Sequence, residues 1–295
     1  MRDKHRLIYA AITVSLFLLS GCGLLSNSDG SHAETVKSEK PENPKELGVI
    51  TVIDRAVKQQ EEKKGLELEF KMDQKMDMMV EGQKQNLDMS MDMWMQGSQN
   101  SEDLHMKGNA KINGGPIPLD MEMEIYQVDG MVYTKIGKMG WMKEKEDQEG
   151  ESVQSPQSSD IMTTLAKMFK SIGGEAIPKG IIMTKENGHY RVEITKAFFL
   201  KNQEMQKELL SMVESRIEDL KKDGVQIKED QIQFNEFNQV VYIDEDTFEY
   251  DRMELISNFT IPTEKDGDVN LEQKIDAQFK GEFKGEIVVP EEAKK

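Results

Sequence analysis

The clearest structural signal in this chain of 295 residues is the alternating run Leu87-Asp88-Met89-Ser90-Met91-Asp92-Met93-Trp94-Met95. Successive side chains of a β-strand point to opposite faces, so a period of two places the leucine and the methionines on one face. The aspartates, the serine and the tryptophan fall on the other. We therefore predict a strand with one buried face and one face in water.

The same alternation recurs on both sides of this run. Apolar residues occupy every second position of residues 66–72, 104–112 and 117–125. Four such runs in succession predict an antiparallel meander that is wet on one side. The apolar positions that we single out as candidates for lining a ligand cavity are Leu87, Met89, Met91, Met93, Met95, Met106, Leu119, Met121 and Met123.

The remainder of the chain predicts further strands and a few helices. A turn at Val128-Asp129-Gly130 precedes a hairpin over 131–143. Additional strands are expected over 189–194, 231–244, 248–261 and 270–288. Helices are expected from an Asn43-Pro44 start to about Gly65, over 160–172 and over 197–222. This order predicts one α+β domain over residues 43–295.

The N-terminus has the features of an export signal. Arg2, Lys4 and Arg6 precede an apolar run over 7–19 that is too short to span a bilayer comfortably. The run ends in Leu19-Ser20-Gly21-Cys22, which resembles the lipobox of bacterial lipoproteins. The resemblance implies a signal peptide over 1–21 and a lipidated Cys22, the only cysteine. The polar residues 22–42 then form a flexible tether.

The strong acidity of the chain restricts its partners. A net charge of −17 argues against general electrostatic binding to nucleic acid or to anionic lipid headgroups. Beyond the leader, no apolar stretch approaches the length of a bilayer span. We expect an extracytoplasmic body held at the cell membrane through Cys22.

Catalytic and metal-binding motifs are weak or missing in the sequence. His105 and His189 are the histidines beyond the leader and the tether, and they show no ligand spacing. We find no nucleophile elbow, zinc-protease helix or phosphate-binding glycine loop. We therefore predict no enzymatic activity, no cofactor and no metal site.

Several short motifs resemble a known class of proteins. They are Tyr126-Gln127-Val128-Asp129-Gly130-Met131-Val132-Tyr133-Thr134-Lys135, Gly140-Trp141-Met142-Lys143 and Val288-Val289-Pro290-Glu291-Glu292-Ala293. With the element order, they resemble a Gram-positive lipoprotein family of uncharacterised function, related to the LolA/LppX-like lipoprotein carriers. The resemblance implies a strongly curved antiparallel half-barrel around helices, with a cavity for a lipid or other apolar molecule.

Three interpretations of the methionine-rich face remain open. The face is a dry core, or it lines a cavity that accepts acyl chains, or its thioethers bind Cu(I). Copper is the weakest of these, because Trp94 and His105 fall on the face opposite the methionines. We expect a lipoprotein that binds or carries an apolar ligand; the alternatives are a solid-core protein-interaction lipoprotein and a Cu(I)-binding lipoprotein.

Overall fold

A computed structural model describes residues 47–80, 83–98, 103–114, 118–145, 179–200, 217, 220–221, 225–265 and 267–294. The predicted signal peptide (1–21), Cys22 and the tether (22–42) lie outside these residues. So do the helix expected over 160–172 and most of the helix expected over 197–222.

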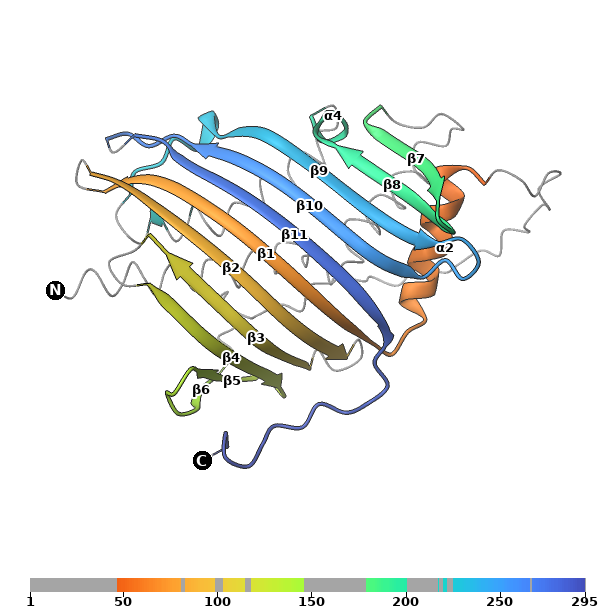
Figure 1. Ribbon diagram of the computed structural model, residues 1–295, viewed down its shortest axis with the longest axis horizontal. Helices are drawn as coiled ribbons and strands as arrows, with labels where there is room; N and C mark the ends of the chain where they lie inside the picture. Colours follow the sequence, from red (N-terminus) through yellow and green to blue (C-terminus); the bar gives the residue numbers. More distant parts are fainter. Residues whose placement is uncertain are drawn as a thin grey trace, which may run out of the picture.

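The described chain forms a broad antiparallel sheet of 11 strands (Figure 1). The strands before the gap at 146–178 are β1 (Gly65–Val80), β2 (Gln83–Ser98), β3 (Leu104–Asn113), β4 (Leu119–Val128), β5 (Met131–Ile136) and β6 (Met142–Lys145). Those after it are β7 (Ile181–Glu186), β8 (His189–Thr195), β9 (Gln233–Asp244), β10 (Tyr250–Ile261) and β11 (Val269–Glu282). The described helical segments are α2 (Val49–Glu61), α4 (Lys196–Phe199) and the 3₁₀ turn η2 (Glu229–Gln231).

The strand order shows two meanders joined at the middle of the sheet. It runs β6-β5-β4-β3-β2-β1-β11-β10-β9-β8-β7. Consecutive strands pair with each other, except that β6 and β7 do not pair, and β1 pairs with β11. The first and last strands of the described chain therefore lie side by side at the centre, and β6 and β7 are the edges of the described sheet.

The sheet is curved rather than flat (Figure 1). Its register shifts between Glu67 and Leu68 on β1, and at two places on β10. Such irregularities bend a strand and increase its twist. The expected α+β fold, with a curved antiparallel sheet and few helices, is confirmed.

The methionine alternation places a largely apolar face on one side of the sheet, here called the inner face. Met72 pairs with Met91, Met91 with Ala110 and Ala110 with Met121, so these side chains project to the same side. Helix α2 packs against this side through Val49, Val52, Ile53, Ala56 and Val57, which join the same buried cluster as the methionines. We call the opposite side the outer face.

The predicted ends of the first helix were wrong. Helix α2 begins at Val49, after Gly48 in an extended conformation with ψ of 153°, rather than at Asn43-Pro44. Glycine is acceptable at an N-cap because it adopts extended angles freely. The helix ends at Glu61, and Gly65 is the first residue of β1 rather than the helix cap.

Two features near the ends of strands were also missed. Strand β7 forms a hairpin with β8 through Asn187 and Gly188, whose φ angles are +50° and +80°. An Asn-Gly pair between apolar runs is a strong hairpin signal, so this strand was detectable. The strand expected to reach residue 288 ends at Glu282.

The segment after β11 crosses to the outer face and packs there (Figure 1). Ile287, Val289 and Ala293 are buried against Tyr126 of β4 and Tyr133 of β5. This segment leaves the sheet because its apolar residues bury themselves against aromatic rings instead of pairing with another strand. The described chain thus carries apolar packing on both faces of the sheet.

Candidate functional site

The predicted cavity residues all lie on the inner face. Met89, Met91, Met93, Met95, Met106 and Met123 are buried, with exposed fractions of 6% or less. Leu119 and Met121 are partly buried against the same cluster. Leu87 contacts a second cluster built around Met76, Met78, Phe259 and Leu271.

Strand pairing brings the sulfur atoms of this face into a soft, adaptable surface. Met95 pairs with Met106, and Met93 lies opposite Phe70 on β1. Thioethers are polarisable and their side chains have many rotamers, so such a surface can adjust its shape to an apolar partner. The sequence predicted this arrangement because alternation alone determines which side chains share a face.

Uncharged polar side chains interrupt the inner face, and the sequence analysis did not single them out. Gln74 of β1, Gln273 of β11 and Ser257 of β10 are each 2% exposed, and Gln239 of β9 is 3% exposed. A signal was present, since Gln74 occupies an apolar phase of the run Phe70, Met72, Gln74, Met76.

The outer face carries an aromatic and acidic cluster that only pairing across strands assembles. The ring of His105 stacks on Tyr126 with a centroid separation of 4.0 Å, and Trp94 meets His105 edge-on at 5.2 Å. His105 Nε2 lies 3.1 Å from Glu124 Oε1, and the Tyr126 hydroxyl donates to the same oxygen. Trp94 and His105 thus lie on the side opposite the methionines, as predicted.

Burial shifts the pKa values of His105 and Tyr126. Burial lowers the pKa of His105, and the hydrogen bond with Glu124 partly opposes this shift. Burial, followed by the hydrogen bond to Glu124, raises the pKa of Tyr126. His105 is therefore neutral at pH 7, and Tyr126 keeps its proton.

A hollow of about 560 Å³ lies beside this cluster on the outer face. Its polar lining includes Trp94, Lys107, Asn109, Glu122 and Lys135. Lys107 Nζ lies 4.5 Å from the centre of the Trp94 ring, so the ammonium group occupies that face of the indole. Of the predicted cavity residues, Met93 and Met123 border this hollow.

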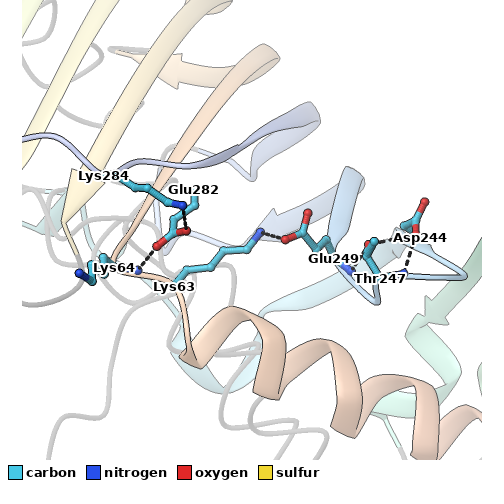
Figure 2. A network of polar contacts seen from close by, with 7 residues as sticks. All are labelled: Lys63, Lys64, Asp244, Thr247, Glu249, Glu282 and Lys284. Atoms are coloured by element: carbon cyan, nitrogen blue, oxygen red, sulfur yellow. Dashed lines mark hydrogen bonds and ion pairs between the residues drawn. The ribbon is translucent and has the colours of Figure 1, made fainter.

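A chain of polar contacts links the end of α2 to the ends of β9 and β11 (Figure 2). The buried Lys63 pairs with Glu249 over 3.2 Å, and Glu282 accepts from the backbone N–H of Lys64 over 3.1 Å. Hydrogen bonding from Lys64, and then from Lys284, lowers the pKa of Glu282. These contacts hold α2 against the sheet at the end where β1 begins.

Asp244 organises the turn between β9 and β10 at the far end of this chain of contacts. Its carboxylate accepts hydrogen bonds from the backbone of Asp246 and from the backbone and hydroxyl of Thr247. The Thr247 backbone contact is the main reason that the pKa of Asp244 is lowered. The Asp244 carboxylate therefore caps the backbone of its own turn.

A family model matches residues 49–295, a range that includes every strand of the described sheet. The chain belongs to DUF6612, a family of unknown function. No curated protein matches this DUF6612 chain. The sequence motifs likewise resemble a family of uncharacterised function.

Solved structures similar to the DUF6612 chain include two bacterial proteins of low sequence identity. LprF from Mycobacterium bovis has 8% identity and a TM-score of 0.39, and the match covers 82% of this chain and 96% of LprF. A LolA superfamily protein from Nitrosomonas europaea has 5% identity and a TM-score of 0.23, with the same coverage of 82% and 96%. The second of these proteins belongs to the LolA superfamily, which the sequence motifs also resemble.

Two kinds of feature are absent from the described residues. No described helix is both long and apolar enough to cross a membrane. Within the described ranges, no group of three or more His, Cys, Asp and Glu side chains is arranged to hold a metal ion.

Proposed function

We propose that this DUF6612 protein is a membrane-anchored extracytoplasmic lipoprotein that binds a lipid or other apolar ligand against its inner face. The observation that carries the proposal is the largely apolar face that β1 to β4 present, rich in methionine and packed against α2. Binding is non-covalent. The ligand gains free energy by removing apolar surface from water, about 25 cal/mol per Å² before ordering costs.

The composition of the face supports tolerance rather than sharp selectivity. Met91 and Met93 of β2 and Met123 of β4 share the inner face on either side of β3, and unbranched thioether side chains repack at low cost. The same flexibility suits a carrier, which has to release its ligand as well as bind it. A face built of β-branched side chains would be stiffer and would fit ligands of fewer shapes.

Native mass spectrometry of the chain lacking residues 1–22, purified from a bacterial host without detergent, tests the proposal. We expect co-purified mass that extracts into organic solvent and is identified as lipid. A bare protein mass that added phospholipid does not change would contradict the proposal. That outcome favours the solid-core interaction protein instead.

Replacing both Met91 and Met93 by leucine separates the competing functions. Leucine keeps the volume and the apolar character, so lipid binding is retained and the folding cost stays below about 1.5 kcal/mol per site. Cu(I) binding would be lost, because leucine has no sulfur ligand. Binding of a protein partner to the outer face would be unchanged.

The proposed anchor has its own test, independent of the ligand. Cys22→Ser removes the thiol that diacylglycerol would modify. We expect the wild-type chain in the membrane fraction of a bacterial host and the variant outside it. Retention of both in the membrane would contradict lipidation at Cys22.

A further inference from the structure

A row of uncharged polar side chains crosses the middle of the inner face. Gln74 on β1 lies opposite Gln273 on β11, which in turn lies opposite Ser257 on β10. Gln239 on β9 is one step further, opposite Leu255. We call these residues, Gln74, Gln273, Ser257 and Gln239, the polar row.

The polar row separates the two apolar clusters of the inner face. On one side, Met72 pairs with Ile275 in the larger cluster. On the other side, Met76 pairs with Leu271 in the smaller cluster. The nearest residues on the same face of each strand, two positions before and after Gln74 and Gln273, are therefore apolar.

Hydrogen-bonding capacity in the row is unused. The Oε1 atoms of Gln74 and Gln239 and the Oγ atom of Ser257 are buried, and they have no hydrogen-bond partner among the residues that the structure describes. The amide nitrogens of Gln273 and Gln239 donate to the sulfur atoms of Met72 and Met253, at 3.1 and 3.3 Å. Sulfur is a weak acceptor, so even these contacts satisfy the amides poorly.

Such an arrangement is unfavourable unless something else completes it. A buried acceptor without a donor loses its hydration and gains nothing in exchange, whereas an apolar side chain of the same shape would have no such cost. Native proteins leave few buried polar groups unpaired. Three in one region of an apolar face indicate a ligand that supplies donors.

We propose that the polar row recognises an uncharged hydroxyl or amide N–H group of a long-chain amphiphile whose hydrocarbon lies on the apolar clusters beside it. This inference rests on the proposed function and adds the chemistry of the ligand. The free glutamine oxygens select donors, and Ser257 can both donate and accept. A charged group is disfavoured, because the neighbours of the row on the inner face are apolar and supply no opposite charge.

Matched ligands test the inference on the wild-type chain lacking residues 1–22. Oleyl alcohol, oleamide and oleyl methyl ether share the hydrocarbon chain, but only the first two carry a donor. Their affinities are measured by displacement of the neutral fluorescent probe N-phenyl-1-naphthylamine. We expect the alcohol, the amide or both to bind about tenfold more tightly than the ether, and their ratio identifies the preferred donor.

Substitution within the polar row gives a second test, in which the ligand preference is lost while the stability of the ligand-free protein increases. Gln74→Met keeps the side-chain length but removes the unpaired oxygen. We expect this variant to lose the preference for donor-bearing ligands, while the melting temperature of the ligand-free protein rises by about 2 to 4 °C. Gln278→Met on the exposed outer face of β11 is the matched control and changes neither.

The outcomes separate the two proposals. Equal binding of the alcohol, the amide and the ether overturns the inference about the row and leaves apolar ligand binding intact. Failure of all three to bind overturns both. A Gln74→Met variant that melts lower than wild type and keeps the preference for a donor also overturns the inference, because the row would then be a satisfied structural element.

Discussion

Gln273 donates a hydrogen bond to the sulfur of Met72 over 3.1 Å, although the two residues are 201 positions apart in the chain. This contact crosses the β1–β11 junction, which joins the two meanders into one sheet. The central pair of strands is therefore also the pair that is most distant in sequence. Closing so long a loop has a large entropic cost, which the paired central strands have to offset.

Removal of β11 is predicted to abolish the cooperative fold. A chain ending at Asp268 leaves β1 and β10 without their shared partner and exposes the apolar residues of both. A chain ending at Lys284 keeps β11 and loses only the following segment. Circular dichroism and urea unfolding should show a cooperative transition for the longer chain only; equal transitions would contradict the central role of β11.

The segment after β11 offers a matched pair of valines. Val289 is 5% exposed and packs against the outer-face tyrosines, whereas Val288 is 65% exposed. We expect Val289→Ala to lower the free energy of unfolding by about 1 to 2 kcal/mol. Val288→Ala should change it by less than about 0.5 kcal/mol. Similar effects of both substitutions would show that this packing does not form in solution.

Gly108 allows β2 and β3 to approach closely. A Cβ at this position would lie 2.1 Å from the backbone oxygen of Asp92 and 2.8 Å from Cα of Met93. Gly108→Ala must therefore push the strands apart, and we expect a loss of about 1 to 3 kcal/mol in unfolding free energy. Gly140→Ala is the control, since nothing lies within 4 Å of its Cβ. A stable Gly108→Ala variant would rule out this close approach.

His105 is predicted to make stability depend on pH. Its pKa is lowered in the folded state, so below about pH 6.5 the unfolded chain binds a proton that the folded chain does not. Its contribution to stability is complete above that pH and is lost as the pH falls toward the lower folded pKa. Urea unfolding between pH 7 and 5 should show a weaker pH dependence for His105→Gln than for wild type. A steeper dependence in the variant would contradict the assignment.

The local pattern of apolar and polar residues was sufficient to predict most strands. It was also sufficient to predict which side chains of the candidate site share a face. Alternation identified Met89 through Met95 as one face, because strand geometry alone places every second side chain on the same side. It failed at the start of α2, where Gly48 rather than Asn43 precedes the helix. It also missed β7, although Asn187-Gly188 marked the hairpin.

The sequence by itself determined the period of two, the polarity of each face and the placement of the methionines, since these depend on neighbours along one strand. Only the tertiary structure decided that β1 pairs with β11 and that Gln74, Gln273 and Ser257 form one buried row. It likewise brought Trp94, His105 and Tyr126 together on the outer face. Pairing between distant strands depends on the free energy of the whole sheet, and no local period encodes it.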